Sequence, residues 1–351
     1  MKNFIVFVLF TACVIAQSVR PKLHVDENGA FKITQFTDLH YGDGDHDDET
    51  TQIMRTILKT ENPDFVAFTG DMVAGYGWDK QPGWYEKKWN AFTSILNETR
   101  IPYGYTLGNH DSEADKNRRE IMEIDEQNPW SYSQEGPKDV VGASNFMVPV
   151  YAYKNDTKIV LTLWFLDSGD YNCMGQAGYG CIDPTAIEWY MKKSTEIEKE
   201  QGYPVPGLAF FHIPVPEYLI AWSHFNGVGG RYEDCGCASL NTGLLAAALK
   251  RKDLKATFVG HDHEIDFNID YYGIHLIHGR KTGVGCYGPS EGVKRGGRVI
   301  VAKTTGTNEM SLDTWITNED AEREYQTERT GKVDEKQDIC KNAKTPRVDE
   351  L

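Results

Sequence analysis

Residues 102–111 read PYGYTLGNHD, in which a short apolar run ends on Gly108, Asn109, His110 and Asp111. A run of this length and composition is typical of a buried β-strand. The same arrangement occurs four more times: FKITQFT (31–37) before Asp38-Leu39-His40, DFVAFT (64–69) before Gly70-Asp71, LAFF (208–211) before His212, and ATFV (256–259) before Gly260-His261-Asp262-His263. Because open α/β sheets bind ligands beyond the carboxyl ends of their strands, these five ends predict one shared binding crevice.

Helical patterns lie between several of these strands and place the chain in the α/β class. They cover residues 50–60, 84–97, 184–200 and 241–250, and Pro184 suits the first position of its helix. After Phe267 the pattern changes to strands, which we expect to be antiparallel and to close a second sheet: 269–279, 297–304 and 311–317. Residues 318–351 are charged and poor in apolar side chains, which favours a loose or helix-prone, solvated tail. The simplest organisation is one domain over residues 28–317.

The five strand ends carry metal-binding side chains. They offer two carboxylates, one amide oxygen and five imidazoles: Asp38, Asp71, Asn109, His40, His110, His212, His261 and His263. Mixed nitrogen and oxygen ligands suit transition metals such as Zn, Fe or Mn and suit Ca²⁺ poorly. Since one metal ion takes three or four protein ligands, this set is large enough for two ions.

These blocks, taken in order, resemble the calcineurin-like metallophosphoesterase family. The resemblance rests on D-x-H, GD, GNHD, a strand-end His and GHxH, and it extends from about Phe31 to Ile316. Within the family the chain is most similar to the small purple-acid-phosphatase-related proteins of plants and fungi, through segments such as FTGDMV, GYTLGNHD and FVGHDHEIDF. The resemblance implies a four-layer α/β (α+β) sandwich of two mixed β-sheets flanked by helices.

The resemblance also implies roles for single residues. Asp38, His40 and His263 would bind the first metal, Asp71 would bridge both metals, and Asn109, His212 and His261 would bind the second. His110 would face the phosphate and stabilise the transition state or protonate the leaving oxygen, with Asp111 orienting it. A hydroxide that bridges the two metals would attack phosphorus in line.

The chain departs from purple acid phosphatases proper at two positions. Their ligand Tyr, three residues after the GD aspartate, is replaced here by Ala74, and His40 stands where they have Gly. Without a tyrosinate ligand we expect no purple charge-transfer band. Two divalent or trivalent ions are therefore expected, as an Fe–Zn, Mn–Mn or Zn–Zn pair.

The expected function is hydrolysis of small phosphomonoesters. A phosphodiesterase or nucleotidase would use the same metal core, and a non-catalytic luminal binding protein that keeps the fold is an alternative of another class. The chain of 351 residues has 37 Lys and Arg against 52 Asp and Glu, a formal net charge of −15. This acid excess argues against nucleic acid as a partner.

Both ends of the chain resemble targeting signals. Residues 1–16 contain Lys2, an apolar run and small residues before a cleavage point, as in a secretory signal peptide, and nothing later suggests stable membrane insertion. Residues 348–351 read VDEL and resemble the KDEL signal that a retrieval receptor of the endoplasmic reticulum (ER) binds. We therefore expect the ER lumen, with secretion or a vacuole or lysosome as alternatives.

An oxidising compartment changes the meaning of the cysteines. Beyond residue 16 the chain has six: Cys173, Cys181, Cys235, Cys237, Cys286 and Cys340. An even number suggests up to three disulfides, and Cys173 with Cys181 is the first pair expected. Cys235 and Cys237 are too close for an easy mutual bond, so we expect each to pair elsewhere. Asn97 and Asn155 begin glycosylation acceptor sequences and are expected in surface loops.

Some histidines outside the five strand ends have an ordinary interpretation. His275 and His278 belong to a strand pattern, and we expect them to be structural residues whose ring nitrogens find hydrogen-bond partners within the fold.

Overall fold

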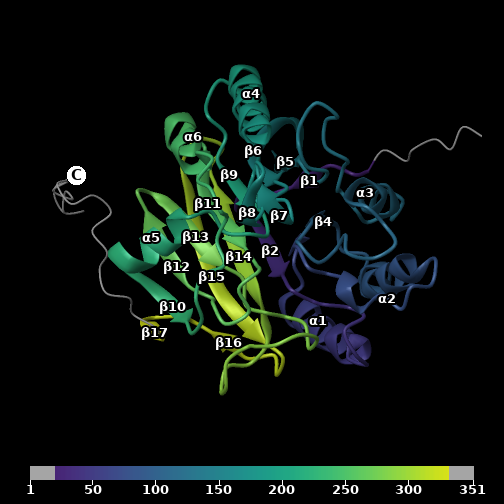
Figure 1. Ribbon diagram of the computed structural model, residues 1–351. Helices are drawn as coiled ribbons and strands as arrows, with labels where there is room; N and C mark the ends of the chain where they lie inside the picture. The colour runs from purple at the N-terminus through teal and green to yellow at the C-terminus, as the bar shows by residue number, and fades with distance from the viewer. Residues whose placement is uncertain (1–19, 332–351) are drawn as a thin grey trace, which may run out of the picture.

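In the computed structural model, which describes residues 20–331, two large mixed sheets face one another (Figure 1). The first sheet has the order β16-β15-β14-β2-β3-β4. Its strands are β2 (Ala30–Phe36), β3 (Phe65–Thr69), β4 (Tyr103–Thr106), β14 (Gly296–Thr304), β15 (Met310–Asn318) and β16 (Arg323–Glu324). β2, β3 and β4 run parallel, whereas β14, β15 and β16 add antiparallel pairs. The C-terminal strand β14 therefore lies beside the N-terminal strand β2, and β15 lies on the far side of β14.

The second sheet has the order β1-β5-β6-β9-β11-β13-β12-β10-β17. Its strands are β1 (Leu23–His24), β5 (Phe146–Ala152), β6 (Asn155–Phe165), β9 (Gly207–Phe210), β10 (Gly227–Arg231), β11 (Leu254–Val259), β12 (Asn268–Tyr271), β13 (Ile274–His278) and β17 (Arg329–Gly331). At its centre β6, β9, β11 and β13 are parallel. A separate hairpin joins β7 (Tyr171–Cys173) to β8 (Gln176–Tyr179).

Helices lie beside the sheets. They are α1 (Asp47–Glu61), α2 (Trp84–Thr99), α3 (Arg118–Glu126), α4 (Pro184–Gln201), α5 (Glu217–His224) and α6 (Leu244–Arg251), with a short 3₁₀ turn η1 (Gly75–Gly77). α1 packs on the first sheet, and α5 and α6 pack on the second. The ends are set by local chemistry: Asn117 forms a capping box with Glu120 before α3, and Asp183 caps α4 ahead of Pro184. None of these helices within residues 20–331 is long and apolar enough to cross a membrane.

The core between the sheets is built from aromatic side chains. Phe146, Phe165, Phe210 and Phe258 stack in a row across neighbouring strands of the second sheet, with ring centroids 4.6–5.1 Å apart. Gly104 of β4 faces Phe165, and a Cβ at Gly104 would lie only 2.6 Å from that ring. The missing side chain thus lets the first sheet approach the second closely, which is why both sheets can contribute to one site.

The fold class predicted from the sequence is confirmed, and so are the four helices predicted, with ends that shift by up to three residues. One expectation was wrong: the strands after Phe267 do not build one sheet. β12 and β13 join the second sheet, whereas β14 and β15 return to β2 in the first. β13 is moreover parallel to β11. The sequence pattern predicted the strands, but it held no information on which neighbouring strand each of them would pair with.

The folded part extends past the predicted limits of 28 and 317. β1 pairs with β5 ahead of residue 28. Beyond residue 317, β16 pairs with β15 and β17 pairs with β10, so the predicted tail begins with two short strands and no helix before residue 332. The signal peptide (1–16), Cys340 and the VDEL ending lie outside the described residues.

The expected disulfide between Cys173 and Cys181 is present and closes the β7–β8 hairpin. The other expectation for the cysteines was wrong: within residues 20–331, Cys235, Cys237 and Cys286 are free thiols. Asn97 and Asn155 are both exposed, although they lie in α2 and at the start of β6 instead of in loops.

Candidate metal centre

The predicted ligands lie where the strands of the two sheets end. Asp38 and His40 follow β2, Asp71 follows β3, and Asn109 follows β4 in the first sheet; His212 follows β9, and His261 and His263 follow β11 in the second. Asp38, His40, Asp71 and His261 all have positive φ angles, between 52° and 76°. Such angles are unfavourable for non-glycine residues and gather at functional sites. The turns therefore direct side chains of both sheets toward one place.

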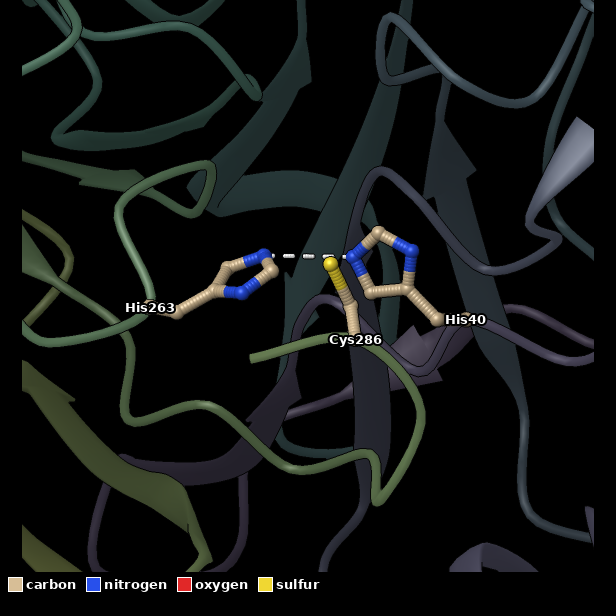
Figure 2. Close-up of side chains that lie close together, drawn as sticks. All are labelled: His40, His263 and Cys286. Atoms are coloured by element: carbon tan, nitrogen blue, oxygen red, sulfur yellow. Dashed lines mark hydrogen bonds between the residues drawn. The ribbon is translucent and has the colours of Figure 1, made fainter. Parts of the chain in front are cut away.

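One group of donors surrounds His40 (Figure 2). Its Nε2 lies 3.1 Å from Nε2 of His263, and His263 Nε2 lies 3.5 Å from Oδ1 of Asp38. Asp38, His40 and Asp71 also bring one donor atom each within 4.8 Å of the others. Cys286, which the sequence reasoning left out of the site, places its thiol beside both imidazoles.

A second group surrounds His212. Its Nε2 lies 3.0 Å from Oδ2 of Asp71, 3.0 Å from Oδ1 of Asn109 and 3.3 Å from Nδ1 of His261. Asp71 thus contacts both groups, the position that a bridging carboxylate requires. All seven predicted ligands come together in these two groups; their roles as ligands stay predictions.

The donor set fits two transition-metal ions. A single N–H of His212 cannot donate to three neighbours at once, and the facing Nε2 atoms of His40 and His263 have at most one proton to share. A cation among such lone pairs would satisfy all of them together. Imidazole nitrogens with carboxylate and amide oxygens are the ligands that Zn, Fe and Mn accept.

The electrostatics of the centre favour positive charge. Burial alone would raise the pKa of Asp38, but the hydrogen bond to His263 and its charge lower that pKa below its usual value. Burial would lower the pKa of His212, yet Asp71 raises it to about 9. His263 behaves alike, because burial and Lys281 oppose its protonation whereas Asp38 raises its pKa to about 9. The two buried carboxylates therefore stabilise cations in this place.

Backbone carbonyls orient the imidazoles. Nδ1 of His212 lies 2.7 Å from the carbonyl oxygen of Thr69, and Nδ1 of His263 lies 2.9 Å from that of Tyr287. A neutral imidazole that donates from Nδ1 in these bonds keeps a lone pair on Nε2, which points into the centre. Such second contacts are typical of histidines that bind metals.

Asp111 does not orient His110, contrary to the expectation. Its Oδ2 accepts hydrogen bonds from the backbone N–H groups of Asp71 and Gly108, and its Oδ1 accepts one from Val73. Asp111 is fully buried and fixes the turn that carries Asp71. The motif placed it next to His110 in sequence, but adjacent side chains in a tight turn point in different directions.

His110 lies at the open side of the centre. Its Nδ1 is 2.7 Å from Oε2 of Glu113, and its ring centroid lies 4.9 Å from Tyr76 and 5.8 Å from His40. The side chain is partly exposed, and no donor of either metal group comes from it. Glu113, three residues further on, takes the orienting position that the sequence assigned to Asp111.

Besides Tyr76, three further tyrosines line the centre. The Tyr171 hydroxyl accepts from Asn109 Nδ2 at 3.3 Å, Tyr179 meets His261 edge-on at 4.3 Å, and Tyr287 stacks on His263 at 4.3 Å. Tyr171 and Tyr179 belong to the hairpin that the disulfide closes. The open side is therefore bordered by aromatic rings.

Comparisons with known proteins find related sequences and a shared fold. Residues 31–264 match the model of the calcineurin-like phosphoesterase family. An Arabidopsis thaliana protein named probable inactive purple acid phosphatase 29 is 33% identical over 336 residues, which cover 85% of either chain. Phosphatase DCR2 of Saccharomyces cerevisiae is 29% identical over 273 residues, 70% of this chain and 46% of the yeast protein. A solved dimetal phosphatase from Danio rerio shares the fold, with a TM-score of 0.52 at 13% identity over 80% of this chain and 98% of that one.

Proposed function

The chain belongs to the calcineurin-like phosphoesterase family, and we propose that it is a phosphoric ester hydrolase with two metal ions that acts on small phosphomonoesters. The observation that carries this proposal is the position of Asp71, which contacts both groups of donors while His110 stands beside them unused. A centre built only to hold metal would not need a partly exposed imidazole on its open side.

The bound ions would lower the pKa of a water molecule that attacks phosphorus and would offset the charge of the phosphate. The chain's own residues do the rest. Asp38, His40 and His263 would hold one ion, Asn109, His212 and His261 the other, and Asp71 would contact both. His110 would place a proton on the leaving oxygen or stabilise charge there, with Glu113 holding its Nδ1.

The test is a hydrolysis panel on the purified full chain. Monoesters and diesters are offered after chelation and after Zn²⁺, Mn²⁺ or Fe²⁺ has been added back. We expect turnover of monoesters that depends on added metal, with diesters turned over at least ten times more slowly. Faster hydrolysis of diesters would support a phosphodiesterase in place of the phosphomonoesterase, and turnover of nucleotides alone among the monoesters would support a nucleotidase.

A non-catalytic binding protein is the second candidate, because the plant relative is named as inactive. The complete set of seven donors together with His110 and Glu113 supports an enzyme instead. Two bound metal ions without hydrolysis of any ester in the panel would favour the binding protein. Absence of bound metal after reconstitution would exclude the enzyme.

The proposed location is the lumen of the ER. The disulfide between Cys173 and Cys181 supports an oxidising compartment, and the VDEL ending suits a retrieval receptor. Deleting residues 348–351 should increase the fraction of the protein that cells secrete. Equal secretion of both forms would contradict retrieval.

A further inference from the structure

A third group of donors lies behind the metal centre. It consists of Cys235, Asp262 and His278, whose Sγ, carboxylate and ring nitrogen atoms lie within 4.8 Å of one another. Cys235 belongs to the loop between β10 and α6, Asp262 to the turn after β11, and His278 ends β13. Three segments far apart in the sequence thus meet at one point, and the predicted ligands His261 and His263 flank Asp262.

His278 is not the satisfied structural residue that the strand pattern suggested. It is fully buried, and neither of its ring nitrogens has a hydrogen-bond partner. The rings of Phe267 and Tyr218 hold it at centroid distances of 4.6 and 5.1 Å. A buried polar atom without a partner costs about 1–3 kcal/mol, so an imidazole with two such atoms needs an explanation.

The side chain opposite is also incomplete. Oδ1 of Asp262 accepts a hydrogen bond from the Gly236 N–H at 2.7 Å, whereas Oδ2 has no hydrogen-bond partner and lies 3.9 Å from Nε2 of His278. His275, on the same strand as His278, shows the contrast, because its Nδ1 bonds to Asn268 at 2.9 Å. Two buried atoms without hydrogen-bond partners, Asp262 Oδ2 and His278 Nε2, therefore lie close together in this group.

Two thiols complete the surroundings. The Cys235 thiol contacts the Asp262 carboxyl and the thiol of Cys237. Burial lowers the pKa of His278, so its imidazole is neutral, the form that binds metals. Sulfur, imidazole and a carboxylate oxygen suit zinc, while Mg²⁺ and Ca²⁺ require oxygen ligands.

We propose that Cys235, Asp262 and His278 bind a zinc ion, separate from the two ions at the strand ends, with Cys237 placed to supply the fourth ligand. On binding, the Cys235 thiol releases its proton to solvent and its sulfur lone pair bonds to zinc. The ion ties the Cys235 loop and β13 to the turn that carries His261 and His263. Its role is structural, and it positions these two histidines.

The first test counts the metal ions bound to the purified full chain after chelation and reconstitution with zinc. Wild-type protein is expected to hold three ions per chain, and Cys235→Ser and His278→Leu are expected to hold two. His275→Gln is the matched control on the same strand and keeps three. If wild type and both variants hold the same number of ions, the proposal fails. Should the core variant His278→Leu not fold, the half-buried loop variant Cys235→Ser decides alone.

The second test uses Co²⁺ in place of zinc, because a thiolate ligand to Co²⁺ produces a charge-transfer band in the near ultraviolet. Wild type and Cys286→Ser should show the band, and Cys235→Ser should lose it. If only Cys286→Ser lost the band, the thiolate ligand would be Cys286, beside His40 and His263, and the proposal would be overturned. The proposal would also be overturned if the wild type lacked the band because Cys235 and Cys237 form a disulfide. Neither readout depends on hydrolysis, so failure here is distinct from failure of the proposed function.

Discussion

At the scale of single residues, Asp71 is the junction of the candidate metal centre. Its Oδ2 contacts His212, its Oδ1 accepts the backbone N–H of His110, and its own N–H donates to Asp111. It follows β3 with a φ of 54°, so the turn, and not helix or strand geometry, sets where its carboxylate points. A change at Asp71 should therefore affect both ions at once.

Asp71→Asn is expected to remove the negative charge between the two groups and to reduce the metal content at both. Turnover should fall by at least 100-fold. Asp64→Asn is the matched control, because Asp64 lies directly before β3 whereas Asp71 follows its other end. This variant should keep both metal and activity. Metal analysis and a hydrolysis assay provide the readouts; full activity of Asp71→Asn would contradict the bridging position.

His110→Ala should separate catalysis from metal binding. We expect turnover to fall by about 10²–10⁴-fold, the usual contribution of a general acid or base, while metal content stays as in wild type. Glu113→Gln should give a smaller loss in turnover, since it weakens only the hydrogen bond between residue 113 and Nδ1 of His110. If metal content fell in parallel with turnover in His110→Ala, His110 would be a ligand and its proposed role wrong.

The seven candidate ligands could be found in the sequence because each follows an apolar run in a pattern with few alternatives. The partners of His110 could not. Asp111 and Glu113 both follow it closely, and only the path of the turn decides that Glu113 reaches Nδ1. Cys286 and Tyr287 come from a loop far along the chain, and no periodicity marks a residue that the fold brings to the centre from such a distance.

At the scale of elements, the strand-to-loop turns need glycine for close approach. Gly108 follows β4 and lies against Asp71, and a Cβ at Gly108 would overlap the Asp71 carboxylate. Gly70 has a φ of 88°, and a Cβ at Gly70 would likewise overlap the side chain of His212. The glycines that precede Asp71 and Asn109 thus shape the candidate metal centre although their hydrogen side chains offer no ligand atom.

Gly108→Ala is expected to push the Asp71 side chain away and to lower metal content at both positions. Gly202→Ala is the control, because Gly202 ends α4 in open space with a φ of 84°. It should cost about 1 kcal/mol of folding free energy and leave metal content unchanged. Thermal unfolding and metal analysis of both variants check this; equal metal content in the two would contradict the steric argument.

Glu61 joins four elements at the end of α1. Its carboxylate contacts Lys32 of β2 at 2.6 Å, Thr317 of β15 at 2.7 Å and Arg323 of β16 at 2.8 Å. Burial would raise the pKa of Glu61, but these hydrogen bonds lower it to about 2. The stabilisation is therefore complete above pH 4.5 and is lost as the pH falls toward 2.

Glu61→Gln should lower the free energy of unfolding by about 2 kcal/mol at pH 7. The difference from wild type should shrink below pH 4.5, which urea unfolding at several pH values measures. Glu98→Gln removes the exposed pair with Arg55 and should leave the free energy of unfolding nearly unchanged, because such surface pairs are screened by solvent. A pH-independent difference for Glu61→Gln would contradict the charged state assigned to Glu61.

The sequence predicted elements better than their pairing. Helix and strand patterns located α1, α2, α4 and α6, because apolar side chains repeat with the period of the element. The pairing of β14 with β2 depends on contacts between residues about 270 positions apart, which no local pattern encodes. α3 and α5 were not predicted, whereas α6, which is no longer than either, was found because its sequence LLAAALKR is rich in the strong helix formers Leu and Ala.

At the scale of the whole molecule, the candidate metal centre connects the two sheets. The first sheet supplies Asp38, His40, Asp71 and Asn109, and the second supplies His212, His261 and His263. Each group of donors draws on both sheets. Bound ions would thus hold the sheets together, and folding and metal binding should be thermodynamically coupled.

Removal of metal with a chelator should lower the melting temperature, and addition of zinc should restore it. An ion at 100 times its dissociation constant contributes about 2.7 kcal/mol to stability. In Asp71→Asn the response to the chelator should be smaller. A melting temperature of the wild type that is the same with and without chelator would show that the sheets do not depend on the ions.

The order of strands in the first sheet has a consequence for synthesis on the ribosome. The chain makes β2, β3 and β4 within its first 106 residues, but β14, the neighbour that covers the other side of β2, ends only at residue 304. Until then one edge of β2 has open backbone N–H and C=O groups, the kind of edge that aggregates. A nascent chain halted before residue 296 would keep this edge uncovered, so chaperones that recognise exposed strands should bind such a chain in preference to one released at full length.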